Sequence, residues 1–223
     1  QDSCRRCYPA MSAAAHLLRK AHLTALLSMV DIFVAPSRFL ADRFVEWGLD
    51  AGRMTVLPNQ VPAMVHPGRA PRARPDRFAF FGNISPHKGV LPLLAAARLA
   101  GDRVTLDLHG GLGHAEEAFR RSFAEALAAA PNASHRGPYA REDLPALMNR
   151  ADWVVLPSIW WENAPLVLLE ARAAGVPVIC SGIGGMAELV EHGLTGFHVP
   201  PGDDRALAEA LCAAAEDPAG HAR

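Results

Sequence analysis

Two glutamates, Glu162 and Glu170, carry the strongest chemical signal in the sequence. Pro165 suits the first position of a helix, so Glu162 lies in the preceding loop and Glu170 lies about one and a half turns inside the helix. The helical segment LVLLEARAAG is otherwise apolar or small, and a carboxylate there is costly unless it is paired or hydrogen-bonded. A surface position for Glu170 is the alternative, although its neighbours offer little polar face. Two such acceptors suit a polyhydroxyl ligand, such as a ribose diol or a sugar, and the amides at 164–167 suit a phosphate.

A lysine in the segment FFGNISPHKG is the second candidate. The sequence contains only Lys20 and Lys88, and its other strongly basic residues are all Arg. Lys88 lies where a predicted strand turns into a helix, so its ammonium can meet an anion beside the helix N-terminal amides. The alternative is a solvated charge beside Gly89. The P-loop pattern G-x-x-x-x-G-K-[ST] is absent, so this is not a P-loop.

Two glycine-rich stretches raise the alternative of an NAD-dependent Rossmann enzyme. GIGGMA (182–187) fits G-x-G-x-x-A after a predicted strand, and Asp203 and Asp204 follow about 20 residues later, where a ribose-binding acid is expected. These acids, however, follow a Pro-Pro-Gly turn, where they are better placed to cap the last helix. HGGLGHAE (109–116) lacks the third small residue. The NAD alternative therefore rests on one weak motif.

The four cysteines divide into two kinds. Cys180 closes the apolar run VPVIC and Cys212 lies in an Ala-rich helical stretch, so we expect both to be buried free thiols. Cys4 and Cys7 form a C-x-x-C, a spacing found in zinc sites and redox pairs. Because no second pair with metal-ligand spacing follows, we expect no complete metal site in this chain, and further ligands would lie upstream of Gln1.

An alternation of strands and helices must position the candidate residues. The predicted strands cover residues 77–82, 103–109, 133–137, 152–156, 176–180 and 197–199. The predicted helices lie near residues 89–100, 114–129, 141–150, 164–174, 185–192 and 203–216. Apolar strands separated by helices predict an α/β fold with a Rossmann-like parallel sheet and helices on both faces. Because such sheets bind ligands at the carboxyl ends of their strands, we expect the site in the loops after Phe81, His109, Leu156 and Cys180.

The first 60 residues form a separate region. We expect a helix over 10–29, a strand in IFVAP, a helix capped by Ser37 and closed by Gly48, and a strand within 53–58. A Pro-, Arg- and Ala-rich stretch without periodicity then marks a boundary. The predicted domains are therefore residues 1–60 and residues 76–223, with a linker over 61–75.

Length, composition and charge limit the class of protein. The 223 residues are 50% hydrophobic and 20% charged, with a formal net charge of −1. This composition excludes general disorder, and no uninterrupted apolar run is long enough to span a bilayer. Near-neutral charge argues against nucleic acid as a partner. No signal peptide opens the sequence, which favours a cytoplasmic protein, and the start at Gln1 indicates processing or truncation.

Several segments together resemble the retaining glycosyltransferases of family 4 (group 1), which have the GT-B fold. These segments are FFGNISPHKG, the turn at HGG, GPYAREDLPALMNRADWVVLPS, ENAPLVLLEARAAGVPVICS and GGMAELVEHGLTGFHVPPGD. The E-x7-E arrangement of Glu162 and Glu170, with P-S before it and G-x-P-V-I after it, is specific to that group. The likeness covers residues 30–216 and is best over 78–202.

The resemblance implies a fold and an activity. Residues 76–223 would be the C-terminal nucleotide-sugar-binding lobe, and residues 1–60 the remnant of the N-terminal acceptor lobe, whose missing part would be a partner. The implied reaction transfers a sugar from a UDP-sugar or GDP-sugar to a glycan, lipid or other acceptor with retention of configuration. No D-x-D occurs, and neither a metal nor another cofactor is expected. The resemblance also allows peripheral contact with the inner face of the membrane.

The resemblance assigns roles to individual residues. Glu162 would contact the donor sugar, Lys88 would neutralise the diphosphate, and Glu170 would hold the ribose hydroxyls; Glu162 and Lys88 are the predicted catalytic residues. The other predicted donor-binding residues, among which Pro138, Tyr139 and Leu144 would frame the base, are Gly82, Asn83, Gly110, Pro138, Tyr139, Leu144, Asn163, Ala164, Pro165, Leu166 and Val167.

Asn83 departs from the family pattern. The family has Arg directly after the glycine of the first loop, so Asn83 removes one of two phosphate-binding cations. An Arg from elsewhere in the chain is one substitute, which the sequence does not identify. A module that binds a nucleotide sugar without transferring it is the alternative function.

Overall fold

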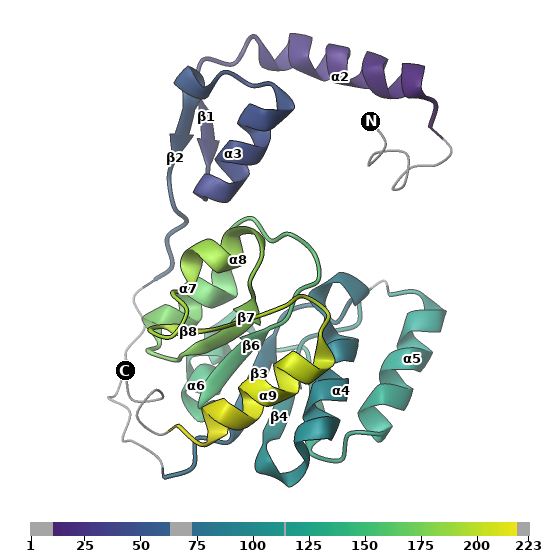
Figure 1. The fold of residues 1–223 in the computed structure, drawn as a ribbon, viewed down its shortest axis with the longest axis vertical. Coiled ribbons are helices and arrows are strands. Elements are labelled where there is room, and N and C mark those ends of the chain that lie inside the picture. Colours follow the sequence, from purple (N-terminus) through teal and green to yellow (C-terminus); the bar gives the residue numbers. More distant parts are fainter. Residues whose placement is uncertain (1–10, 63–72, 114, 218–223) are drawn as a thin grey trace. The chain divides into compact units, whose positions relative to one another are not determined.

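The computed structural model describes residues 11–62, 73–113 and 115–217 (Figure 1). Cys4, Cys7 and most of the predicted linker lie outside these ranges. The chain divides into two compact units, Gln1–Pro58 and Asn59–Arg223. Among the described residues, none of the helices combines the length and apolarity needed to cross a bilayer.

The first unit holds a two-stranded parallel sheet against which one helix packs (Figure 1). Its elements are α2 (Ala13–Leu27), β1 (Phe33–Ala35), α3 (Arg38–Trp47), the 3-10 turn η1 (Ala51–Arg53) and β2 (Met54–Val56). The predicted ends of α3 are confirmed: the Ser37 hydroxyl accepts a hydrogen bond from the Leu40 N–H, and the helix closes at Gly48. No residue of α2 is buried, so little apolar surface supports this helix.

The second unit is built on a six-stranded parallel sheet with the order β5-β4-β3-β6-β7-β8. The strands are β3 (Arg77–Phe81), β4 (Thr105–His109), β5 (Ala133–Gly137), β6 (Trp153–Leu156), β7 (Val178–Ser181) and β8 (Gly196–Val199). The predicted Rossmann-like α/β sheet is therefore confirmed. The strand order reverses between β3 and β6, and this reversal opens a crevice at their carboxyl ends.

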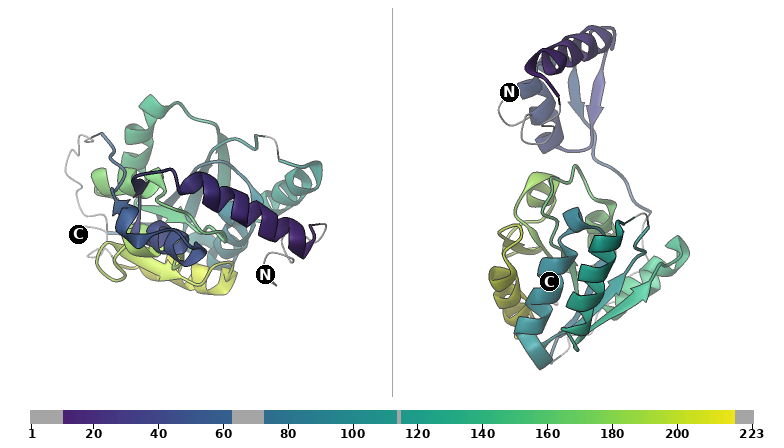
Figure 2. Two further views of the ribbon diagram at one scale, coloured as in Figure 1. Left: turned by 90° about the horizontal axis from the view of Figure 1, so that it is seen from above. Right: turned by 90° about the vertical axis from the view of Figure 1, so that its right-hand side faces the viewer.

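Helices cover both faces of this sheet. They are α4 (Val90–Ala100), α5 (Glu117–Ala128), α6 (Leu144–Arg150), α7 (Leu166–Ala173), α8 (Gly184–Leu189) and α9 (Asp204–Ala215). Right-handed crossovers place α4 and α5 on one face and α6, α7 and α8 on the other, because the connections run in opposite directions along the sheet. Figures 1 and 2 show α4 between α5 and α9 (yellow).

The predicted boundaries differ from the structure where short turns replace regular elements. The strand predicted over 103–109 begins only at Thr105, because the 3-10 turn η3 (Gly101–Arg103) precedes it. The helix predicted over 141–150 is divided into the 3-10 turn η4 (Arg141–Asp143) and α6. The helix predicted over 185–192 ends at Leu189. Each element was nevertheless found in its predicted place in the chain.

The core lies on both sides of β3, β6 and β7. Phe78, Phe80, Trp153 and Ile179 are fully buried, and each large apolar side chain stabilises the fold by roughly 1.5–3 kcal/mol when removed from water. Cys180 is a buried free thiol, as predicted, and burial raises its pKa to about 12. Cys212 is also a buried free thiol.

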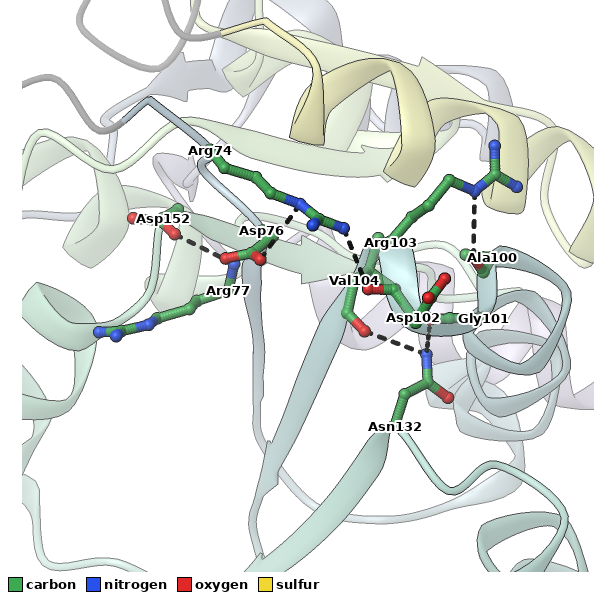
Figure 3. A network of polar contacts seen from close by, with 10 residues as sticks. All are labelled: Arg74, Asp76, Arg77, Ala100, Gly101, Asp102, Arg103, Val104, Asn132 and Asp152. Atoms are coloured by element: carbon green, nitrogen blue, oxygen red, sulfur yellow. Dashed lines mark hydrogen bonds and ion pairs between the residues drawn. The ribbon is translucent and has the colours of Figure 1, made fainter.

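Polar contacts fix the amino ends of the strands, opposite the crevice (Figure 3). The Asn132 side-chain amide donates to the carbonyl oxygens of Gly101 at 2.8 Å and Val104 at 3.2 Å. An Asp152 carboxylate oxygen accepts from the Arg77 backbone N–H at 3.0 Å, which ties the chain before β6 to β3. These contacts hold the strands in register, so the loops at the other end start from fixed positions.

Candidate active site

A cavity of about 520 Å³ lies at the carboxyl ends of the central strands. Its walls are formed by Phe81, Gly82, Asn83, Lys88, Gly110, Gly111, Pro138, Tyr139, Arg141, Leu144, Glu162, Pro165, Leu166, Val167 and Glu170. Of the predicted donor-binding residues, only Asn163 and Ala164 are not among them. The structure therefore brings together residues from loops that are more than 80 positions apart in the chain.

A close approach of two loops places Lys88 beside Glu162. Lys88 ends the 3-10 turn η2 (Pro86–Lys88), and a Cβ added at the next residue, Gly89, would lie only 1.9 Å from the Pro157 carbonyl oxygen. The Ile159 N–H also donates to the His87 carbonyl oxygen at 2.9 Å. The turn after β3 is thus docked on the loop after β6.

Glu162 is held by two donors. Lys88 Nζ donates to Glu162 Oε1 at 2.7 Å, and the buried Ser158 hydroxyl donates to the same oxygen at 2.9 Å. The side chains of Lys88 and Glu162 are 21% and 17% exposed, so the ion pair is partly shielded from water. Lys88 is therefore not a freely solvated charge.

Glu170 is buried inside α7, which rules out the surface position considered for it. Arg141 Nη2 lies 3.5 Å from Glu170 Oε1. Burial raises the pKa of Glu170, and the positive charge of Arg141 opposes this shift. The pKa of Tyr139 is raised by burial and by the negative charge of Glu170. A buried carboxylate with one cationic partner keeps acceptor capacity for a ligand.

The start of α7 differs from the prediction by one residue. Pro165 precedes the helix as its N-cap, with ψ 123°, and is not its first helical residue. Its carbonyl oxygen accepts from the Leu168 N–H at 3.1 Å. The first-turn amides without an acceptor inside the helix are therefore those of Leu166 and Val167, because the first N–H groups of a helix have no intrahelical partner.

Asn163 and Ala164 lie just before this turn and contact other parts of the unit. The Ala164 carbonyl oxygen accepts from the Asn59 side chain at 3.3 Å. The Asn163 carbonyl oxygen lies against the N-terminal end of α8, where a Cβ added at Gly185 would be 1.8 Å away. These contacts fix the loop, and the direct role predicted for both residues in donor binding stays a prediction.

An aromatic wall forms the other end of the cavity. Phe81 and His109 stack with ring centroids 4.9 Å apart, and Tyr139 meets Phe81 edge-on at 5.7 Å. Burial lowers the pKa of His109, although the negative charge of Asp107 opposes this shift. A neutral ring is therefore favoured at this position, beside Phe81 and Tyr139.

The charged side chains of the cavity balance one another. They are Lys88, Arg141, Glu162 and Glu170, so their formal charges cancel. Sequence reasoning missed Arg141, because an Arg in a short polar turn looks like any surface Arg. It also missed Ser158, although the predicted P-S motif contains this residue. Arg141 brings a guanidinium into the cavity, whereas Asn83 contributes only an uncharged amide.

A second cavity of about 950 Å³ lies between α6 and the polar face of β4. Its walls include Thr105, Asp107 and Arg136. Tyr139 and His109, which belong to the aromatic wall, also line this second cavity. It contains neither Glu162 nor Glu170. Although it is larger, we place the candidate site in the smaller cavity, where acceptors, cations and helix amides converge.

The acid required by the NAD alternative has another role. Asp203 caps α9: its carboxylate accepts from the backbone N–H groups of Arg205 at 3.1 Å and Ala206 at 2.9 Å. The predicted capping role is confirmed. In the described ranges, no group of three His, Cys, Asp or Glu side chains is arranged to hold a metal ion.

Comparison with known proteins identifies related chains. Residues 67–223 match the family model described as "Glycosyl transferases group 1". The glycogen synthase of Mycobacterium tuberculosis H37Rv is 32% identical over 199 residues, which is 86% of this chain and 47% of the relative. The chain spans about half the length of the curated relatives it matches.

Solved structures share the fold. Sucrose-phosphate synthase from Thermosynechococcus elongatus superposes with a TM-score of 0.80 and 27% identity, covering 96% of this chain and 57% of the other. Anabaena HepE, in a crystal structure with UDP-glucose, gives a TM-score of 0.78 at 24% identity and covers 91% of this chain and 60% of its own. The sheet described above therefore matches the C-terminal, Rossmann-like lobe of GT-B proteins.

Proposed function

Because the chain belongs to the group 1 glycosyltransferase family, we propose that it is the donor-binding half of an enzyme that transfers a sugar from a nucleotide-sugar donor. The acceptor is a glycan, a lipid or another hydroxyl compound, and transfer retains the anomeric configuration. The observation that carries the proposal is the cavity in which Lys88, Glu162 and Glu170 converge at the reversal of strand order. In this proposal residues 76–223 form the donor lobe and residues 1–60 belong to the acceptor lobe.

The donor lies with its nucleoside toward the aromatic wall and its sugar toward Glu162. Glu170 accepts hydrogen bonds from the ribose hydroxyls, and Pro138, Tyr139 and Leu144 frame the base. The donor is a UDP-sugar or a GDP-sugar. The UDP-glucose in the related fold of HepE supports the first class.

The chemistry required of this lobe is stabilisation of the leaving group. The bond between the anomeric carbon and the diphosphate oxygen breaks, and its electron pair stays on that oxygen, while the acceptor hydroxyl oxygen forms the new bond and passes its proton to the departing diphosphate. The ammonium of Lys88 and the N–H groups of Leu166 and Val167 stabilise the developing negative charge. Glu162 accepts hydrogen bonds from hydroxyl groups of the donor sugar and so orients that sugar.

Calorimetric titration with UDP, GDP and NAD tests the proposed donor class. We expect UDP or GDP to bind and Glu170→Ala to weaken that binding, because the ribose loses its acceptor. Glu209→Ala, which removes an exposed glutamate of α9, serves as the control and leaves binding unchanged. Binding of NAD alone, without an effect of Glu170→Ala, would contradict the proposal.

A second experiment assigns Lys88. Lys88→Ala should weaken the binding of the nucleoside diphosphate more than that of the nucleoside, because only the first carries the charge that Lys88 neutralises. Equal losses for both ligands would count against this role.

Transfer from a labelled donor separates an enzyme from a binding module. The assay compares this chain with the full-length gene product. Transfer by the longer protein and not by this chain is the expected result. Donor binding without transfer by either protein would favour the binding module.

A further inference from the structure

An exposed aromatic pair lies next to the candidate active site. Trp160 and Trp161 are 63% and 55% exposed, and Ile159 before them is 47% exposed, whereas Trp153 of the core is 1% exposed. Indole side chains carry a large apolar area. Exposed apolar residues that are neighbours on the surface often mark an interaction site.

This pair stands on a loop that is held at both ends. The Ile159 N–H donates to the His87 carbonyl oxygen at 2.9 Å, and the Gly185 N–H donates to the Glu162 carbonyl oxygen at 2.7 Å. The close packing of Gly185 on the Asn163 carbonyl oxygen leaves no room for a side chain between α8 and this loop. The indoles are thus presented by a fixed backbone, which lowers the entropy cost of binding a ligand there.

The pair also lies at one particular end of the site. Trp161 directly precedes Glu162, whose carboxylate is bonded to Lys88. One residue of extended chain spans at most about 3.6 Å, so the Cα atoms of both tryptophans lie within about 8 Å of the Glu162 Cα. The aromatic wall of Phe81 and Tyr139, by contrast, is formed by the loops after β3 and β5. The exposed pair therefore belongs to the sugar end of the site.

The charge pattern of the loop indicates which partner fits. The loop PSIWWENAP (157–165) contains no Lys or Arg, and its charged residue is Glu162. Membrane-surface patches combine aromatic residues with basic ones that attract anionic lipids, so this loop lacks half of that signature. A neutral pyranose ring has an apolar C–H face that stacks on an indole and a rim of hydroxyls that a nearby carboxylate accepts.

We propose that Trp160 and Trp161 form a stacking platform for a neutral pyranose ring of the acceptor, which makes the acceptor a glycan. This inference rests on the proposed function, because it takes Glu162 to mark the donor sugar. The platform holds the acceptor ring against the edge of the cavity, where its hydroxyl reaches the anomeric carbon of the donor. This lobe then contributes to acceptor recognition as well as to donor binding.

The test measures oligosaccharide binding to this chain by calorimetry, with and without saturating UDP. The probes are maltohexaose, cellohexaose, chitohexaose and mannohexaose. We expect at least one to bind, Trp160→Phe to retain its affinity, and Trp160→Leu and Trp161→Leu each to weaken it about threefold to tenfold, because Leu is apolar but has no ring to stack. Trp47→Leu, in the first unit, is the matched control and should change nothing.

Three results would overturn the platform. The first is that no probe binds, and the second is that Trp160→Leu binds the sugar as tightly as Trp160→Phe. The third is that the tryptophans are needed only for binding to vesicles of phosphatidylcholine and phosphatidylglycerol. The third result would assign the pair to a membrane surface. UDP affinity is measured for every variant and should not change. A wild-type chain that binds a sugar but no nucleotide contradicts the proposed function, and one that binds UDP but no sugar contradicts the platform.

Discussion

Glu170 and Arg141 show at the residue scale how a buried acceptor is kept ready for a ligand. A buried carboxylate tends to take up a proton, because burial disfavours its charged form. Burial raises the pKa of Glu170, and the guanidinium of Arg141, 3.5 Å away, opposes that shift. Arg141 is thus a positioning residue for the acceptor that the ribose hydroxyls require.

Replacing Arg141 should change the pH dependence of nucleoside binding. In Arg141→Gln the pKa of Glu170 rises further, so protonation removes the acceptor at a higher pH than in the wild type. The affinity for uridine or guanosine, whichever binds, is measured between pH 4 and 8. A nucleoside is used because it carries no phosphate that Arg141 itself could attract.

Arg74→Gln is the control for this experiment. Arg74 also pairs with a carboxylate, that of Asp76 at 3.4 Å, but at the opposite end of the sheet (Figure 3). It should leave the pH profile unchanged. An unshifted profile for Arg141→Gln would show that Arg141 does not act through Glu170.

The same raised pKa has a consequence for stability. Between the ordinary pKa of 4.5 and the raised value, the folded chain binds more protons at Glu170 than the unfolded chain. The contribution of Glu170 to stability is therefore fully present below pH 4.5 and falls as the pH rises through the raised pKa. Glu170→Gln removes this loss.

We accordingly expect Glu170→Gln to be more stable than the wild type at pH 7 and equally stable at pH 4. Each kcal/mol of difference in the free energy of unfolding moves Tm by about 2–4 °C in a protein of this size. Thermal unfolding at both pH values measures the effect, and Glu209→Gln should show none. A lower Tm at pH 7 would mean that ionised Glu170 stabilises the fold.

At the scale of elements, the site depends on how closely the loop after β3 meets the loop after β6. Gly89 has φ +69°, and its Cα lies too near the Pro157 carbonyl oxygen to carry a side chain. This contact holds the two loops together, so that Lys88 reaches Glu162.

Gly89→Ala should therefore reduce both stability and diphosphate binding. The left-handed conformation alone costs an L-residue about 1–2 kcal/mol, and separating the loops adds to that cost. Gly193→Ala is the control, since its φ is also positive, at +81°, and nothing lies within 4 Å of the added Cβ. Urea unfolding and UDP titration measure both effects. Equal losses in the two variants would show that the close approach is unimportant.

At the scale of the whole chain, the two units differ in how much apolar surface they bury. In the described part of the first unit, the buried apolar residues are Ala35 and Ala41, whereas Leu18, Met29 and Val34 are largely exposed. The second unit has a continuous core around its sheet. Regions with few buried contacts open more readily, so the two units should differ in local stability.

Limited digestion with thermolysin should expose this difference. We expect early cleavage within residues 11–58 and a resistant fragment that contains residues 77–215, from the start of β3 to the end of α9. Mass spectrometry locates the cuts, and added UDP should slow cleavage of the second unit only. Earlier cleavage within the sheet would contradict this order of stability.

Much of this organisation could be predicted from local patterns. Apolar runs separated by segments of helical periodicity were sufficient to predict the parallel sheet. The spacing of Glu162 and Glu170 was sufficient to predict two acceptors at its edge. Arg141 and Ser158 could not be assigned, because their roles depend on contacts with residues distant in the chain. The one-residue error at Pro165 has a similar cause. Proline suits both the N-cap and the first helical position, and contacts of the surrounding loop determine which of the two it occupies.

The ion pair between Lys88 and Glu162 has a consequence for turnover. In the proposed reaction, an intact donor gives each residue a new partner: the diphosphate for Lys88 and the sugar hydroxyls for Glu162. A nucleoside diphosphate without its sugar gives a partner only to Lys88 and leaves Glu162 with Ser158 alone. Re-forming the pair therefore competes with the spent nucleotide more effectively than with the donor, and the chain's own carboxylate helps to expel the product.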